Sequence, residues 1–390
     1  MIKASIRELW PRLRDGESRA SNAVVLAGLL AFATTIRILV NNVSHFSPAD
    51  ETVYLQFVQT LAHGGGYRAV IKSFIDDQSL WVFPNPLRWS YLETATLYCT
   101  VRGACRYRTL ATLSTLSGIL AVPVSYWLGA RLFDRRTAVV TVTLMATAPL
   151  QLALGRRALV DEFFCLAVLA SIVAMVEWLR SHRIAWLITW IAVTTIAFGA
   201  KEQFFFIYPV VLAAWWIRER RIYWVWAIPP ALFFICFCVL ARDLESFFRI
   251  AHIITSMMDA PYAEELQSGP PHRLLIDFLT IAPLVTLGFI AACCFQPGTR
   301  RDGQVFTLLL SAGILIVHSF LPSKNIRYVV AADPFMRLLV ASWLPRAKWT
   351  AVALVGNAIV ELTIFNYVFI EHAVYDPTTN ALLRAFRMVP

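Results

Sequence analysis

About eleven apolar runs, each long enough or nearly long enough to cross a bilayer, account for most of this 390-residue chain. Hydrophobic residues make up 58% of the sequence and charged residues only 15%, with a mean hydropathy of +0.60. This composition excludes a soluble domain and predicts an all-α, polytopic membrane protein. The runs fall at roughly 22–41, 109–131, 137–154, 162–179, 184–200, 203–217, 222–240, 274–295, 304–320, 329–344 and 350–370.

Lysine and arginine cluster before the first run and in the loops that follow every second run. By the positive-inside rule, this pattern places residue 1 in the cytoplasm. The formal net charge of +10 therefore reflects cytoplasmic flanks, and no nucleic-acid partner is expected. The loops assigned to the cytoplasm carry Arg131, Arg135, Arg136, Arg180, Arg183, Arg218, Arg220, Arg221, Arg300, Arg301, Arg346 and Lys348.

One moderately apolar segment, 88–101, is too short to span the bilayer and carries Glu93. We interpret residues 88–108 as an interfacial helix on the outer face of the membrane. Its arginines then lie outside, against the usual bias. Either the assigned topology is wrong here, or these arginines contact anionic lipid phosphate, and we favour the second alternative. These arginines are Arg102, Arg106 and Arg108.

The chain is expected to be a single membrane-embedded domain over residues 1–390, with no separate soluble domain. Its long first outer loop covers 42–108, and a second large outer loop covers 241–273. The seven cysteines show no metal-ligand spacing, and no disulfide framework is predicted.

Two adjacent carboxylates, Asp50 and Glu51, follow the first run on the outer side. Placing acidic groups near lipid costs free energy, so two adjacent carboxylates at the end of a membrane-spanning segment indicate a functional role. Ser47 is a candidate helix N-cap, Pro48 suits the first helical position, and Asp50 follows in the first turn. Asp50 can complete a capping box, and it can also act as the general base for an acceptor hydroxyl, since a helix N-terminus keeps a carboxylate ionised.

Two further outer loops mix acids and bases. In the first, Arg156 and Arg157 are candidates for a phosphate, and Asp161 for a substrate hydroxyl or a divalent metal. These charges can also simply neutralise one another. In the second, Lys201 and Glu202 either pair with each other or face a wet site.

A fourth charged group lies at 324–328, before a proline that breaks or kinks the next helix. Acids and bases from four separated loops on one face predict one polar site at the outer interface. The candidate residues are, for catalysis, Asp50, Glu51 and Asp161; for a donor phosphate, Arg88, Arg156, Arg157, Lys201 and Arg327; and for substrate, Tyr54, Glu202, Lys324 and Tyr328.

Several motifs in this order resemble the GT-C glycosyltransferases, over roughly residues 20–345. Within that superfamily the chain is most similar to the branch that holds protein mannosyltransferases and lipid A aminoarabinose transferases. The motifs are D-E-x-x-Y and G-G-G-Y between Asp50 and Tyr67, P-x-P-L from Pro84, R-x-L-x-D from Arg157 to Asp161, the lysine at 201, and K-x-x-R-Y-x-x-x-x-x-P from Lys324 to Pro334.

The resemblance implies inverting transfer of a monosaccharide from a polyprenyl-phosphate carrier to an acceptor hydroxyl on a glycan, lipid or protein. It implies an integral protein of the bacterial inner membrane with its site facing the periplasm, or the lumen in a eukaryote. Asp50 and Asp161 match the acids of the family's first and second outer loops. Arg327 matches a late basic position that faces the donor phosphate.

The chain departs from the aminoarabinose transferases at Pro84, where they have a lysine, and at Asn85, where they have a proline. Another basic residue, such as Arg88 or Lys72, would then supply that charge. No cofactor is expected to be required; because the second loop has no spaced D-x-D, a divalent metal is the alternative rather than the expectation.

Two other functions fit a charged site in a membrane protein. One is a transporter or flippase of lipid-linked sugar, although transporters carry inverted repeats and midplane charges that are not evident here. The other is a catalytically silent assembly partner of another membrane enzyme.

Overall fold

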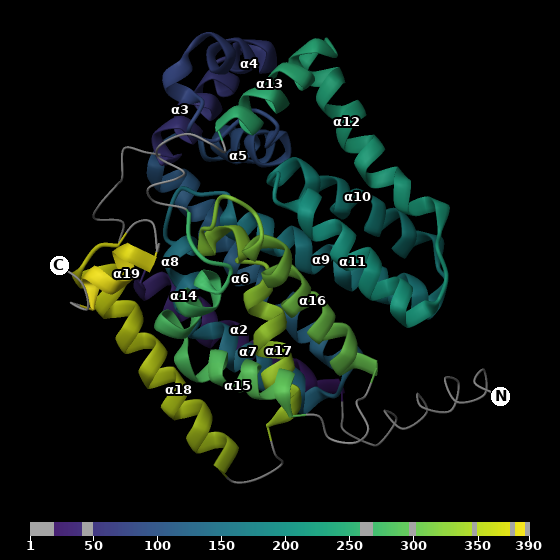
Figure 1. Ribbon diagram of the computed structural model, residues 1–390, viewed down its shortest axis with the longest axis vertical. Coiled ribbons are helices and arrows are strands. Elements are labelled where there is room, and N and C mark those ends of the chain that lie inside the picture. Colours follow the sequence, from purple (N-terminus) through teal and green to yellow (C-terminus); the bar gives the residue numbers. More distant parts are fainter. Residues whose placement is uncertain are drawn as a thin grey trace.

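The computed structural model describes residues 19–40, 50–257, 268–295, 302–344, 349–374 and 379–386. All regular secondary structure in these ranges is helical, so the predicted fold class is confirmed (Figure 1). Ser47 and Pro48, the proposed cap of the helix that carries Asp50, lie outside the described residues, as do the basic pairs at 300–301 and 346–348.

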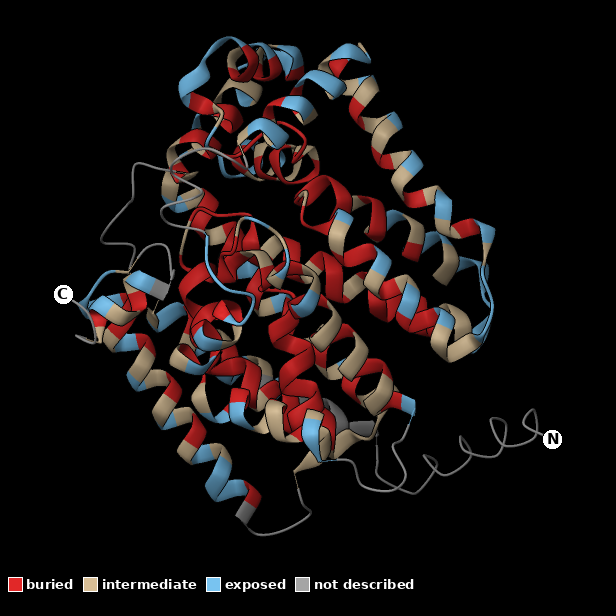
Figure 2. Cartoon of the chain, viewed as in Figure 1, coloured by how far each residue is buried: buried red, intermediate tan, exposed pale blue. Residues whose placement is uncertain are grey.

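Two long helices, α6 (Tyr107–Leu132) and α9 (Asp161–Ser181), form the centre of the molecule. α9 is apolar on all sides and buried on nearly all of them (Figure 2), as expected for the inner helix of a membrane bundle. It packs between α6 and α10 (Ile184–Ala200). Its N-terminus therefore points into the protein, where a charged side chain needs a partner.

Four amphipathic or short helices gather at one end of the molecule (Figure 1). They are α3 (Asp50–Ala62), α4 (Gly66–Asp76), α5 (Trp89–Arg102) and α13 (Glu245–Ser256). The turn between α3 and α4 needs left-handed backbone at Gly64 and Gly66, which only glycine adopts without strain. α5 packs against α3, α6 and α10; that it lies in the membrane interface stays a prediction.

The remaining helices complete the bundle around this centre. They are α2 (Arg19–Val40), η2 (Gln78–Leu80), α7 (Arg135–Ala146), α8 (Pro149–Gly155), α11 (Phe204–Glu219), η3 (Trp224–Ala227), α12 (Ile228–Ala241), α14 (Arg273–Ile281), α15 (Pro283–Cys294), α16 (Asp302–Ser319), η6 (Ile326–Val329), α17 (Ala332–Trp343), α18 (Trp349–Phe365), the π-helical η7 (Asn366–Glu371) and α19 (Thr379–Ala385).

Each predicted apolar run coincides with a helix or with a pair of consecutive helices. In the described part of the chain, five helices are long and apolar enough to cross a membrane, and α7 with α8 forms a sixth candidate that is bent by 57°. Shorter apolar helices lie at Leu30–Val40, Ile184–Ala200 and Pro283–Cys294. The protein is an integral membrane protein; eleven crossings stay a prediction.

The break between α7 and α8 leaves backbone carbonyls inside the bundle, and arginines bind them. Arg337 Nη1 donates to the Leu144 carbonyl at 2.7 Å, and Arg37 Nη2 to the Met145 carbonyl at 3.4 Å. Buried helix ends need such partners because the interior offers little water. Arg337 is itself paired with Asp333 and Glu361, so these charges inside the bundle stabilise its broken helix.

Candidate functional site

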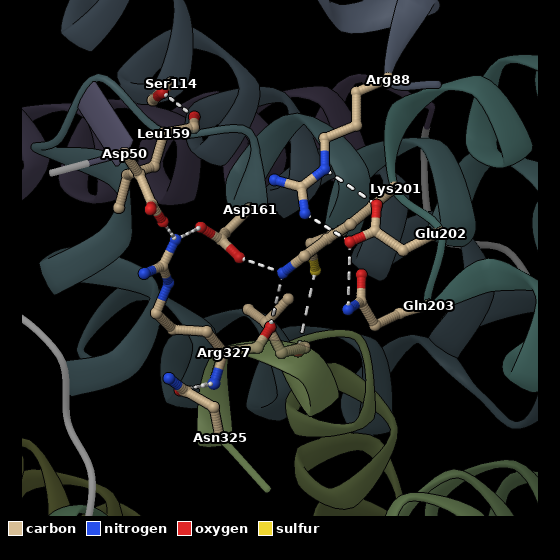
Figure 3. A network of polar contacts seen from close by, with 12 residues as sticks. Asp50, Arg88, Ser114, Leu159, Asp161, Lys201, Glu202, Gln203, Asn325 and Arg327 are labelled. Carbon is tan, nitrogen blue, oxygen red and sulfur yellow. Dashed lines mark hydrogen bonds and ion pairs between the residues drawn. The ribbon is translucent and has the colours of Figure 1, made fainter. Parts of the chain in front are cut away.

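Four charged residues from four separate segments meet near the end of the molecule that carries α3 and α5 (Figure 3). Asp50 and Asp161 are the first residues of α3 and α9, and Lys201 directly follows α10. Arg327 lies on η6, the short turn before α17. Helix N-termini favour nearby carboxylates, and the ends of these elements set where the four groups lie.

Arg327 joins the two acids. Its Nη2 lies 2.8 Å from Asp50 Oδ2 and 3.3 Å from Asp161 Oδ2. The Asp161 side chain is fully buried, whereas 22% of the Asp50 side chain is exposed. Asp50 is therefore the acid of this pair that solvent can reach, while Asp161 binds the arginine from the buried side.

Lys201 binds the other oxygen of Asp161. Its Nζ lies 2.5 Å from Asp161 Oδ1 and donates to the Arg327 carbonyl at 3.2 Å. The ammonium also lies over the Tyr328 ring, 5.2 Å from its centroid. The Lys201 side chain is 1% exposed, so it forms a buried ion pair with Asp161 next to Arg327.

A second ion pair borders this cluster. Arg88 forms two parallel hydrogen bonds with the Glu202 carboxylate, one of them Nε to Oε2 at 2.8 Å, and donates a third to the Tyr54 hydroxyl. Burial opposes ionisation of Glu202, but Arg88 outweighs it and lowers the pKa of Glu202 to about 2. The bidentate geometry fixes the turn after α10 relative to the start of α5, and the bond to Tyr54 adds α3 to this contact.

Glu51 does not face the cluster but holds the loop before Asp161. Its Oε1 accepts a hydrogen bond from the Ala158 amide at 2.8 Å, and its Oε2 lies 3.8 Å from Arg157 Nη1. Arg157 is thus a neighbour of Glu51. The prediction that Glu51 is catalytic and Arg157 binds phosphate stays untested, and their contacts indicate a supporting role.

Sequence reasoning missed three residues that orient the site. Ser114 Oγ donates to the Leu159 carbonyl at 2.6 Å and Thr115 Oγ1 to the Gly155 carbonyl at 2.8 Å, so α6 holds the loop before Asp161. Asn325 Oδ1 accepts from the Arg327 amide at 3.0 Å and caps η6. Asparagine favours turns, so the residue two positions before Arg327 could have been predicted to cap the turn. The hydroxyls of Ser114 and Thr115 lie inside an apolar run, and nothing in the sequence indicated their role.

The remaining candidates occupy other surroundings. Lys324 Nζ donates to the Leu321 carbonyl at 2.9 Å, and burial together with nearby Arg273 lowers the pKa of Lys324. Arg156 is buried at the end of α8, where burial and its neighbour Arg157 lower its pKa. Their roles as substrate and phosphate ligands stay predictions.

Adjacent Asp161 and Glu162 point to different neighbours. The Glu162 carboxylate lies against Gly118 of α6 and near Arg37 of α2: a Cβ built on Gly118 would be 2.9 Å from Glu162 Oε2 and 3.2 Å from Arg37 Nε. Glu162 therefore faces α2 and α6 rather than Arg327. Within the described ranges, no three histidine, cysteine or carboxylate side chains cluster in a way that could hold a metal ion. The facing oxygens of Asp50 and Asp161 are bound by Arg327, so these residues do not fit a divalent ion, and no step is assigned to one.

We expect Lys201→Met to destabilise the protein by about 3–5 kcal/mol, because it leaves the buried Asp161 carboxylate one partner short. Thermal unfolding in detergent measures the loss. The double variant Lys201→Met/Asp161→Asn removes both charges and should be more stable than Lys201→Met alone. Equal unfolding midpoints for wild type and Lys201→Met would contradict the buried pair.

The Arg88–Glu202 pair should persist in mild acid. The pKa of Glu202 lies below the ordinary glutamate value, so the stabilisation is fully present above the unfolded-state pKa, about 4.3, and is lost as pH falls toward the folded-state value. The difference in unfolding midpoint between wild type and Glu202→Gln should be constant from neutral pH to about pH 5 and shrink below it. A difference that vanishes between pH 7 and pH 5 would contradict the pairing.

Comparisons with known proteins identify the family of this chain. The model of the dolichyl-phosphate-mannose–protein mannosyltransferase family matches residues 24–254, more than half of the chain. The chain belongs to this family. With it, the chain belongs to the GT-C superfamily of glycosyltransferases, which use polyprenyl-phosphate-linked sugars. A search of curated protein sequences found no match.

Solved structures of the superfamily share the fold of this mannosyltransferase-family protein. ArnT from Cupriavidus metallidurans, bound to undecaprenyl phosphate, superposes with a TM-score of 0.62 at 16% identity, over 92% of this chain and 66% of ArnT. The oligosaccharyltransferase AglB from Archaeoglobus fulgidus, in complex with an inhibitory peptide and a dolichol-phosphate, gives 0.55 at 12% identity, over 94% of this chain and 56% of AglB. The chain thus spans about two thirds of the length of ArnT and just over half of AglB.

Proposed function

We propose that this mannosyltransferase-family protein transfers a monosaccharide from a polyprenyl-phosphate carrier to an acceptor hydroxyl, with inversion at the anomeric carbon. The observation that carries the proposal is Arg327 bridging Asp50 and Asp161, with Lys201 on the far oxygen of Asp161. A partly exposed acid beside two buried cations provides a base for the hydroxyl and positive charge for the departing phosphate. The lipid phosphates in the ArnT and AglB structures support this donor class.

Asp50 acts as the base or as the group that orients the acceptor. The acceptor O–H bond breaks as its oxygen attacks the anomeric carbon, and the proton passes to an Asp50 oxygen. The bond from the anomeric carbon to the phosphate oxygen breaks on the opposite face, and its electron pair stays with the phosphate. The phosphate therefore changes from a singly charged diester to a monoester that carries more negative charge.

Arg327 couples these two events. In the resting site its Nη2 is shared between Asp50 and Asp161. When Asp50 takes up the proton it loses its charge, and the hydrogen bond between Asp50 and the Arg327 guanidinium weakens. The guanidinium is then available to the phosphate at the moment its charge grows, while Asp161 keeps the arginine anchored. This is transition-state stabilisation by a preorganised donor.

We place the site on the periplasmic face of a bacterial inner membrane, with a glycan, lipid or protein as acceptor and the surrounding membrane lipid as solvent for the polyprenyl chain. The charge pattern of the loops supports this orientation. The test is to incubate the purified protein, in lipid nanodiscs, with a radiolabelled polyprenyl-phosphate sugar and envelope extract as acceptor. Labelled acceptor and free polyprenyl phosphate are expected in equal amounts. A transporter would leave the donor intact, and intact donor across a panel of sugars would overturn the proposal.

A further inference from the structure

Two cysteines meet where α5 turns into α6. α5 ends with left-handed Gly103, whose amide donates to the Thr100 carbonyl at 3.1 Å while the Ala104 amide donates to the Cys99 carbonyl at 3.2 Å. This paired pattern is a Schellman motif, which folds the chain back against the last turn of the helix. It brings Cys105 against Cys99, and the two thiols interact through their side chains.

The turn that carries Cys105 is held rigidly. Gln59 Nε2, on α3, donates to the Cys105 carbonyl at 3.1 Å, and Thr109 Oγ1 donates to the Ala104 carbonyl at 3.1 Å. Cys99 is 2% exposed, whereas Cys105 is half-buried. The two thiols are therefore neighbours on one turn, and Cys105 is within reach of a reagent from solution.

This turn lies at the same end of the molecule as Asp50. Thr52, two residues after Asp50, shares a hydrogen bond of 2.9 Å with the Tyr107 hydroxyl just past the turn. If the proposed function is right, this end faces the periplasm or lumen, where thiols are kept oxidised. The further inference rests on that orientation.

We propose that Cys99 and Cys105 form a disulfide in the mature protein, made by exchange with the disulfide of a thiol-oxidising protein of the outer compartment. The Cys105 thiolate attacks one sulfur of that disulfide and releases the other as a thiolate. The Cys99 thiolate then attacks Cys105 Sγ and releases the second. One S–S bond forms, the oxidant's S–S bond breaks, and its two sulfurs take up two electrons and, through solvent, the two protons that the cysteines release, to become a dithiol.

The order of attack follows from burial. Burial and the Cys105 thiol raise the pKa of Cys99 to about 12, so the thiolate of Cys99 is scarce and enclosed. Cys105 is the sulfur that an oxidant meets first. The bond would clamp the α5–α6 turn, and through Gln59 it would steady α3, the helix that carries Asp50.

Mass spectrometry of the protein purified from membranes without reductant tests the disulfide. Free thiols are alkylated first, and the protein is then digested. The expected result is an unalkylated Cys99–Cys105 peptide that is two hydrogens lighter than its reduced form and becomes alkylated only after reduction. Cys294, which is exposed, is alkylated without reduction and serves as the control within the same molecule.

A reductant should lower the thermal unfolding midpoint of wild type by about 2–6 °C, because the cross-link closes only a short loop. The matched variant Cys99→Ser/Cys105→Ser should show no response to reductant. Full alkylation of both cysteines without reduction, or equal responses of the two proteins, would overturn the disulfide.

A labelling control distinguishes absence of the disulfide from an error in the proposed function. Arg102, exposed on the same turn, is changed to cysteine in the Cys99→Ser/Cys105→Ser background and treated in intact cells with a membrane-impermeant maleimide. Labelling together with reduced native thiols would overturn the disulfide and leave the proposed orientation standing. Absence of labelling would overturn the outer-face placement on which both proposals rest.

Discussion

Asp50→Asn is expected to fold normally and to lose sugar transfer by about 10²- to 10⁴-fold, the usual contribution of a general base. Asparagine keeps an oxygen that can accept hydrogen bonds and can still cap the helix, but it cannot take up a proton. The variant therefore separates a capping role from a chemical one. The loss should appear in kcat, because the proton moves only in the transition state.

The measurement is single-turnover release of polyprenyl phosphate from a bound polyprenyl-phosphate sugar. Asp76→Asn, which changes an exposed aspartate on neighbouring α4, should behave like wild type. Asp50→Glu restores a carboxylate and should recover part of the rate. Near-normal transfer by Asp50→Asn would leave Asp50 as a helix cap only.

Arg327→Gln is expected to lower the transfer rate by about 10²- to 10³-fold, the effect of removing one well-placed donor from developing negative charge. The loss has a structural part as well, because Asp161 is fully buried and would lose one of the two cations that contact it. Unfolding midpoints are therefore measured beside the rates.

Arg327→Lys keeps the charge and limits that structural loss. It should fold, and it should transfer sugar faster than Arg327→Gln but more slowly than wild type, since an ammonium cannot reproduce the planar guanidinium that spans Asp50 and Asp161. Arg183→Gln, which changes an exposed arginine in a loop assigned to the cytoplasm, is the matched control. A folded Arg327→Gln protein with wild-type transfer would remove Arg327 from the mechanism.

The sequence predicted the helices well, because apolar length alone locates a segment that must avoid water. The breaks inside two of the predicted runs were not foreseen. The run 137–154 is divided into α7 and α8 just before Pro149, and the run 274–295 into α14 and α15 just before Pro283. Both prolines are visible in the sequence, and proline inside a helix favours a break. A window of hydrophobicity averages over such a residue and reports one continuous span.

The charged groups were found, but their partners were not. The sequence left two alternatives for Lys201 and Glu202, a pair with each other or a wet site. In the structure Lys201 pairs with Asp161 and Glu202 with Arg88. Ion pairs depend on which helix ends meet in space, and that is set by the packing of α3, α9, α10 and η6 rather than by local sequence. For the same reason, Glu51 and Asp50 are adjacent in the chain yet bind different loops.

Asp50 and Arg327 act as one catalytic unit in this account, and a double-mutant cycle on the transfer rate tests that claim most directly. The rates of wild type, Asp50→Asn, Arg327→Gln and the double variant are measured under single-turnover conditions, with the same donor in the same nanodiscs. If protonation of Asp50 frees Arg327 for the phosphate, the double variant should lose about as much as the worse of the two single variants. Losses that multiply in full would show that the two residues act independently and would contradict the account.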